Sequence, residues 1–210
     1  MIIAIDGPAA AGKGTLAHRL AEHFNLAFLD TGSLYRAVGK KVVDQGGDPE
    51  DADFARLMAD GLSPDDLTAD GLRTEEVGQA ASKVSAIPGV RASLLQFQRD
   101  FATNPPGDAN GAVLDGRDIG TVVCPDASAK LFITASAEVR AERRLKELLG
   151  RGSEAIYARV LEDMKERDAR DSARAASPLE PADDAKTLDT SDLDADQAFA
   201  EALTFINSKV

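Results

Sequence analysis

A glycine-rich loop lies between an apolar strand-like run and an amphipathic helix at the start of the chain. Residues 2–5 read IIAI, the loop DGPAAAGKGT follows at 6–15, and residues 13–24 carry apolar side chains at helical spacing. Such a strand–loop–helix unit binds anions, because backbone N–H groups of the loop and of the helix N-terminus point at phosphate oxygens. The glycines let the backbone wrap closely, and Lys13 can reach the terminal phosphates of a nucleoside triphosphate.

The loop departs at one place from the usual phosphate-loop pattern G-x-x-x-x-G-K-[ST]. Gly7 to Lys13 fit the pattern, but Gly14 stands where Ser or Thr is expected, and Thr15 comes one place late. Two other classes of nucleotide-binding protein therefore stay open as alternatives.

The first alternative is a dinucleotide-binding protein such as an NAD-dependent dehydrogenase. Gly12–Ala17 match G-x-G-x-x-A, and Asp30 closes the next strand where a ribose-binding acid belongs. A six-residue connection separates the first strand from Lys13, however, whereas the first glycine of that motif follows its strand directly. The second alternative is a GTP-binding protein, since residues 44–47 and 108–111 fit D-x-x-G, but the chain has no N-K-x-D sequence to bind guanine.

Strand and helix patterns alternate through most of the chain, with one interruption. From about 48 to 110 the alternation stops, and helical pieces separated by Gly, Pro and Asp take its place. The alternation predicts a parallel sheet with right-handed crossovers, and the interruption predicts a helical insertion. The expected strands are residues 2–5, 26–29, 111–115, 129–134 and 185–190, and the expected helices are residues 13–24, 33–46, 136–150, 153–171 and 194–210.

The composition limits the partners of the chain. Its 210 residues suit one domain with an inserted piece, and a net charge of −12 repels nucleic acid and anionic lipid. No apolar run has the length of a membrane span, and the N-terminus lacks the basic region of a secretory signal. Cys124, the single cysteine, is expected to be a small buried hydrophobe. We therefore expect a cytoplasmic protein that binds neither nucleic acid nor membrane.

Arginines gather where two predicted strands end, at the edge where ligands bind in open α/β sheets. The segment DTGSLYR places Thr31, Tyr35 and Arg36 at the start of a helix. Taken alone, Thr31 has the residue type of a helix cap. Arg36, one turn into the helix, is expected to contact an anion. The segment DGRDIGT places Arg117 and Asp118 directly after the third strand. Phosphoryl transfer needs positive charge around the transferring group, so this edge predicts a phosphoryl-transfer site.

A third cluster lies in the segment KERDARDSAR. On a helix, Arg167, Asp171 and Arg174 share one face with Arg170 beside it, a pattern that also fits a solvated face of ion pairs. Arginines on the preceding helix form a second face across the break at GRGS, which predicts a mobile flap that closes over phosphates and excludes water. These arginines are Arg140, Arg143 and Arg144.

Four motifs, in this order along the chain, together resemble bacterial cytidylate kinases. They are DGPAAAGKGT, DTGSLYRA, DGRDIGTVVCPDA and ERDARDSARAASPL, and they extend over nearly the whole chain. The resemblance implies phosphoryl transfer from ATP, with Mg²⁺, to CMP or dCMP. Another nucleoside-monophosphate (NMP) kinase, such as a UMP/CMP kinase, stays open as an alternative.

The same resemblance implies a three-layer α/β fold with a phosphate loop (P-loop). A five-stranded parallel sheet in the order 2-3-1-4-5 lies between helices, with a helical NMP-binding insertion and a short lid. The expected division is a single domain over 1–210, with its core at 1–47 and 111–210, the insertion at about 48–110 and the lid at about 145–170.

Individual residues also receive roles from the resemblance. Asp115 is expected to orient a water molecule of Mg²⁺ without any direct protein ligand to the metal, and the enzyme is expected to be a monomer. Residues 62–77 are shorter than in those enzymes, which leaves the preference between CMP and dCMP open. The expected ATP-binding residues are Gly7, Pro8, Ala9, Ala10, Ala11, Gly12, Lys13, Gly14 and Thr15. The expected substrate-binding residues are Thr31, Tyr35, Arg36, Ser82, Arg91, Arg117, Asp118, Arg167, Asp171 and Arg174. The expected catalytic residues are Lys13, Arg117, Asp118, Arg167 and Asp171.

Overall fold

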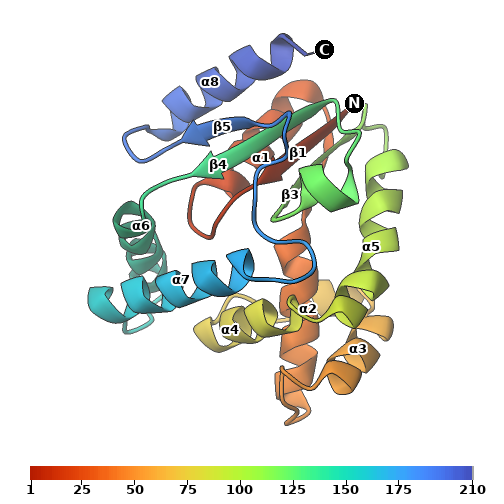
Figure 1. The fold of residues 1–210 in the computed structure, drawn as a ribbon, viewed down its shortest axis with the longest axis vertical. Helices are drawn as coiled ribbons and strands as arrows, with labels where there is room; N and C mark the ends of the chain where they lie inside the picture. The colour runs from red at the N-terminus through yellow and green to blue at the C-terminus, as the bar shows by residue number, and fades with distance from the viewer. Residues whose placement is uncertain (210) are drawn as a thin grey trace.

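The computed structural model describes residues 1–209, and a parallel sheet of five strands lies at its centre (Figure 1). The strand order is β2-β3-β1-β4-β5, which confirms the predicted order. All four strand pairs are parallel, so every strand ends at the same edge of the sheet. The strands are β1 (Ile2–Asp6), β2 (Ala27–Asp30), β3 (Ala112–Gly116), β4 (Ala129–Thr134) and β5 (Lys186–Asp189).

Helices cover both faces of the sheet. These elements are α1 (Lys13–Phe24), α5 (Pro88–Thr103), the π-helical turn η2 (Ile119–Val123) and α8 (Ala195–Asn207). Alternate residues of a strand point to opposite faces, so Ile3 and Ile5 pack against α1 and α8, whereas Ala4 and Leu114 pack against α5 and η2. Cys124 is buried on the α5 face, as predicted. The result is the three-layer arrangement that the alternating pattern predicted.

A helical bundle follows β2 and packs beside the sheet. Its further elements are α2 (Thr31–Asp44), α3 (Ala52–Asp60), the 3₁₀ turn η1 (Pro64–Leu67) and α4 (Glu75–Val84). Leu34, Val38 and Val42 of α2 share one apolar cluster with residues of α3, α4 and α5. A Cβ atom on Gly39 would lie 2.8 Å from the backbone nitrogen of Ala81, so this glycine allows α2 and α4 to approach closely. The helix α2 therefore packs with the predicted insertion, and the division into core, insertion and lid stays a prediction.

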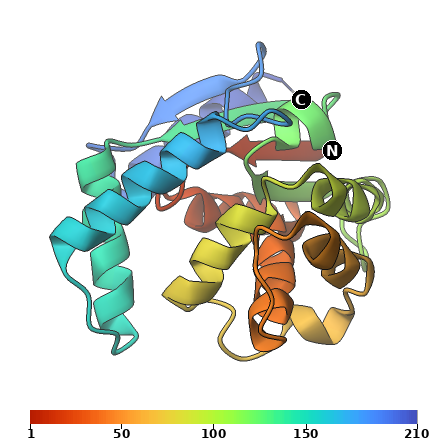
Figure 2. The same ribbon diagram turned by 60° about the horizontal axis from the view of Figure 1, so that its bottom comes forward.

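Two helices, α6 (Ala137–Gly150) and α7 (Tyr157–Ser172), form a hairpin on the other side of the sheet edge. Ala141 and Leu148 of α6 pack against Val160 and Met164 of α7. Figure 2 shows this hairpin facing the helical bundle, with α7 running toward α4. No helix among residues 1–209 is long and apolar enough to cross a membrane.

Helix boundaries differ from the prediction at three places. The helix α2 begins at Thr31 rather than residue 33, because the extended Asp30 already occupies the N-cap position. The helix α7 begins at Tyr157, and residues 153–156 connect the hairpin instead, since Ile156 is extended. The last helix ends at Asn207, and the predicted end of that helix, Val210, lies outside the described residues.

Candidate active site

A cavity of about 1080 Å³ opens at the edge where the strands end, between the helical bundle and the α6–α7 hairpin. Its floor is the loop after β1, and its walls come from α2, α4, the turn after β3, and both helices of the hairpin. Most of the residues that the sequence predicted to bind nucleotides line it. They are Ala9, Ala10, Gly12, Lys13, Gly14, Thr15, Thr31, Tyr35, Arg36, Arg91, Arg117, Asp118, Arg167, Asp171 and Arg174.

Four predicted residues do not line the cavity, namely Gly7, Pro8, Ala11 and Ser82. Ser82 is buried, and its hydroxyl accepts a hydrogen bond of 3.3 Å from Nε of Arg170. Ser85, at the end of the same helix, lines the cavity in its place. The sequence patterns did not predict a role for Ser85, which lies three residues after Ser82.

The loop after β1 has the backbone geometry of a phosphate-binding loop. Gly7 has a φ of 142°, and a Cβ atom there would lie 1.9 Å from the carbonyl oxygen of Ile133, so only glycine fits. Nζ of Lys13 donates to the carbonyl oxygen of Pro8 at 3.0 Å and lies 3.6 Å from the carboxylate of Asp115. Burial lowers the pKa of Lys13 to about 8, although Asp115 acts in the opposite direction. The loop therefore holds the buried amino group of Lys13 in place through contacts within the protein.

Residues from the second half of the chain hold this loop from outside. The hydroxyl of Thr190, directly after β5, donates to the carbonyl oxygen of Ala11 at 2.9 Å and accepts from Arg143 at 3.0 Å. Arg140 forms two hydrogen bonds, of 3.1 and 2.7 Å, with the carboxylate of Asp168. The prediction that Arg140 and Arg143 cover bound phosphates is therefore wrong, because both guanidinium groups are occupied by contacts within the protein.

Cationic side chains crowd the part of the cavity opposite the loop. The buried Nε atoms of Arg167 and Arg174 have no hydrogen-bond partner among the described residues. Burial, together with the nearby charges of Arg117 and Arg36, lowers the pKa of Arg167 to about 10. Three guanidinium groups close together in a buried place offer a binding position for an anion. Arg36 is itself held by Asp30 at 2.5 Å.

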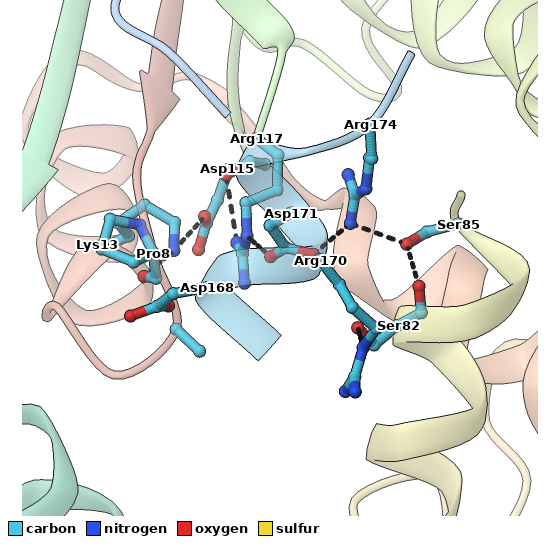
Figure 3. A network of polar contacts seen from close by, with 12 residues as sticks. Pro8, Lys13, Ser82, Ser85, Asp115, Arg117, Asp168, Arg170, Asp171 and Arg174 are labelled. Atoms are coloured by element: carbon cyan, nitrogen blue, oxygen red, sulfur yellow. Dashed lines mark hydrogen bonds and ion pairs between the residues drawn. The ribbon is translucent and has the colours of Figure 1, made fainter. Parts of the chain in front are cut away.

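The predicted face of α7 points into the cavity and carries a chain of charged contacts (Figure 3). Nε of Arg117 donates to Asp171 at 3.0 Å, and Asp171 also pairs with Arg174. Burial opposes ionisation of Asp171, but Arg117 and Arg174 hold its pKa below the usual range. Arg174 donates further to the hydroxyl of Ser85 at 2.8 Å. This face is therefore not a solvated surface of ion pairs, and the chain links α7 to the end of α4.

A second buried ion pair joins the turn after β3 to α5. The carboxylate of Asp118 pairs with the guanidinium group of Arg91. That guanidinium group lies 5.6 Å from the ring centre of Tyr35 and donates to the carbonyl oxygen of Ser85 at 3.1 Å. An aromatic ring, a guanidinium group and a carboxylate in one pocket can stack on and hydrogen-bond a nucleobase.

Thr31 lines the cavity, and its side chain bonds to a neighbouring strand rather than to its own helix. Its hydroxyl donates to the carbonyl oxygen of Asp115 at 2.8 Å, so it does not cap α2. This contact joins the start of α2 to the end of β3. Burial raises the pKa of Asp115, while Lys13 acts to lower it. The carboxylate lies only 3.6 Å from the place where a side chain on Gly14 would begin, so the glycine keeps the space in front of Asp115 open.

A series of hydrogen bonds between side chains closes one side of the cavity, between α4 and the α6–α7 hairpin. The sequence patterns did not predict it. Arg170 donates to Gln79 at 2.7 Å, and Gln79 donates to Glu75 at 3.3 Å. Glu75 then accepts from Arg144 at 2.8 Å. No local pattern in the sequence could reveal this series, because it joins helices about 70 to 90 residues apart.

A phosphate loop ending in a buried lysine, on a parallel α/β sheet and facing a pocket of arginines, defines a P-loop kinase. The family model described as "Cytidylate kinase" matches residues 3–208. The cytidylate kinase of Paramagnetospirillum magneticum is 66% identical over 208 residues, which cover 99% of this chain and 98% of that protein. The cytidylate kinase of Rhodospirillum rubrum is 59% identical over 209 residues, covering 100% and 98%. The chain therefore belongs to the cytidylate kinase family and is an enzyme.

Solved structures agree on the fold. A gluconokinase from Sinorhizobium meliloti superposes with a TM-score of 0.52 at 16% identity, covering 98% of this chain and 91% of that one. Both the dehydrogenase and the GTP-binding alternatives are excluded by the family assignment.

Proposed function

We propose that this enzyme transfers the γ-phosphoryl group of ATP to CMP or dCMP, giving ADP and CDP or dCDP. The observation that carries the proposal is the single cavity shared by the phosphate loop and the arginine-rich wall opposite it. We propose that the enzyme works as a monomer. We propose that the enzyme acts in the cytoplasm, which is consistent with its need for ATP.

On the donor side, loop N–H groups and Lys13 would hold the β- and γ-phosphates of ATP. Mg²⁺ would enter with the triphosphate and neutralise charge that develops on its oxygens. Asp115 would orient a water molecule of that ion, and the open space beside Gly14 fits this role. In this proposal the phosphates and water would supply most ligands of the ion.

On the acceptor side, the cation cluster would bind the phosphate of the monophosphate. Arg36, Arg117 and Arg167 surround the position where that phosphate would meet the γ-phosphate, and their charge would stabilise the transferring group. Asp171 would accept hydrogen bonds from the sugar hydroxyls. Little covalent chemistry is needed, because positioning and charge supply most of the rate in phosphoryl transfer.

The base would lie in the pocket of Asp118, Arg91 and Tyr35. Cytosine presents a donor at N4 and acceptors at N3 and O2, and a carboxylate beside a guanidinium group offers the complementary set. Uracil inverts part of this pattern and would leave buried polar groups unpaired, which can reject a substrate by up to about 10⁴–10⁵-fold. We propose Ser82 as a support for this pocket through Arg170 rather than as a direct contact.

A coupled assay of ADP release with CMP, dCMP, UMP and AMP tests the proposal. We expect CMP or dCMP to have the highest kcat/KM, and the Lys13→Ala variant, prepared in the same way, measures contaminating kinases. If UMP or AMP ranks first, the assignment of the base pocket is wrong.

Alanine variants of Arg36 and Arg117 locate the acceptor side. Because both side chains would bind the acceptor phosphate in this scheme, each substitution should raise the KM for CMP far more than the KM for ATP, together with any loss of kcat. Equal effects on both nucleotides would place these arginines at the donor site instead.

A further inference from the structure

A buried carboxylate outside the lining of the cavity holds the turn that follows β3. Asp6 is the last residue of β1 and is only 4% exposed. One of its carboxylate oxygens accepts from the backbone N–H of Ile119 at 2.7 Å, and the other accepts from that of Gly120 at 2.7 Å. These partners lie more than 100 residues away along the chain, and the scheme above gives Asp6 no role.

The two N–H groups belong to the start of η2, where backbone donors have no partner within the helix. The residue in the N-cap position is Asp118, and aspartate is among the residues that most often satisfy such donors with their own side chain. The side chain of Asp118 makes no such capping bond and pairs with Arg91 instead. Asp6 therefore does the capping that Asp118 would otherwise do.

We propose that Asp6 is a positioning residue of the acceptor site: by capping η2 in place of Asp118, it keeps the carboxylate of Asp118 turned toward Arg91 and the base. The proposal rests on the function proposed above for Asp118. Two charge-assisted hydrogen bonds in a buried setting favour the capped turn, and loss of either leaves a buried N–H without a partner. Asp118 is then the nearest carboxylate on the same turn that can fill the position.

Close packing leaves the turn little freedom to satisfy its donors in another way. A Cβ atom on Gly120 would lie 3.3 Å from Asp6 and 3.1 Å from the aliphatic part of Lys130. A Cβ atom on Gly116 would lie 2.6 Å from Ile119 and 2.7 Å from the hydroxyl of Thr31. The turn is enclosed on both sides, so its N–H groups depend on a protein carboxylate rather than on water.

The Asp6→Asn variant tests the proposal, because an amide of the same shape accepts through only one oxygen and presents an NH₂ group to the other N–H. We expect the KM for CMP to rise roughly fivefold to a hundredfold, as for a buried donor left unpaired, while the KM for ATP changes less than about threefold. Asp194→Asn is the matched control, since Asp194 also accepts from two backbone N–H groups at a helix start, on α8. That control should leave both KM values unchanged.

A double-mutant cycle with Asp118→Asn separates positioning from general weakening of the fold. If Asp6 acts through Asp118, the double variant should have nearly the same KM for CMP as Asp118→Asn alone. Multiplicative effects, or equal rises in the KM for ATP and for CMP, would overturn the proposal.

A readout without turnover keeps this test separate from the proposed function. In a crystal structure of nucleotide-free Asp6→Asn, we expect the carboxylate of Asp118 within hydrogen-bond distance of the N–H of Ile119 or Gly120. If Asp118 still pairs with Arg91, the inference is wrong whatever the substrate. If instead the wild-type enzyme fails to phosphorylate CMP, the proposed function fails while this result still stands.

The wild-type protein supplies a second measurement in case the variant does not fold. Burial raises the pKa of Asp6 to about 7, with Asp118 adding to that rise and Lys13 and the two backbone hydrogen bonds opposing it. The amide proton resonances of Ile119 and Gly120 should therefore titrate together between about pH 6 and 8 in NMR spectra. Resonances that stay fixed over this range while Asp6 titrates would show that the carboxylate does not hold the turn.

Discussion

Replacing Arg167 with methionine should stabilise the empty enzyme while abolishing its activity. Burial and two neighbouring arginines lower the pKa of Arg167 from its usual range to about 10 in the folded protein, because they disfavour its charge. At about 1.36 kcal/mol for each tenfold change in the protonation constant, the charged form costs the fold about 3 kcal/mol. The sign follows from linkage: a cation with a lowered pKa is more stable in the unfolded chain, and at neutral pH it is charged in both states.

Methionine keeps an unbranched apolar chain of similar length but removes the charge. For a chain of this size, each kcal/mol changes the Tm by about 2–4 °C, so the upper limit of the gain is roughly 6–12 °C. Thermal unfolding without nucleotide, followed by circular dichroism, measures this change. The matched control is Arg159→Met on the same helix, where the side chain is exposed and no gain is expected.

Ligand binding should reverse the advantage of the variant. CMP or inorganic phosphate should raise the Tm of the wild-type enzyme more than that of Arg167→Met, because only the wild-type protein gains an anion beside its unpaired guanidinium group. A Tm of the empty variant equal to or below that of the wild type would refute the reasoning, since the cation cluster would then not be strained in the absence of an anion.

Four other outcomes follow from contacts at the site. Lys13→Ala should lower kcat by about a hundredfold to a thousandfold, because it removes a preorganised charge. Circular dichroism should show that the variant stays folded. With the pKa of Lys13 lowered to about 8, kcat/KM for ATP should fall as the pH rises past 8, and a flat profile up to pH 10 would contradict this. Gly7→Ala should lower the Tm strongly, because its Cβ would meet the carbonyl oxygen of Ile133 at 1.9 Å, whereas Gly46→Ala, which has open space around it, should cost far less. Glu75→Gln should raise the KM for CMP only about twofold to fivefold, because the Glu75 side chain that pairs with Arg144 is 46% exposed. Glu76→Gln serves as the neighbouring control.

Motifs that lie within one short segment were predictable from the sequence. The phosphate loop, Arg36, Arg117 and the face of α7 all follow from residue types at fixed spacing beside an element boundary, and the structure brings them to one cavity. The strand order is implied by the resemblance, and the structure has that order. Local chemistry decides these features, so a single sequence carries them.

Contacts between distant segments were not predictable, and they account for the errors. Helical spacing correctly placed Arg140 and Arg143 on one face of α6 but could not show that this face meets Asp168 and Thr190. Thr31 has the residue type of a helix cap, yet a tertiary acceptor on β3 takes its hydroxyl. Asp6 looks in the sequence like an ordinary strand end, because its partners come more than 100 residues later.

The hydrogen bond between Thr190 and Ala11 joins the phosphate loop to a segment near the end of the chain. The phosphate loop is encoded within the first 15 residues, but the carbonyl oxygen of Ala11 finds its partner only after the fifth strand has been made. A nascent chain that still lacks residues 186–190 has the loop sequence without the contact that holds its backbone in place. This contact to the phosphate loop therefore forms only near the end of synthesis.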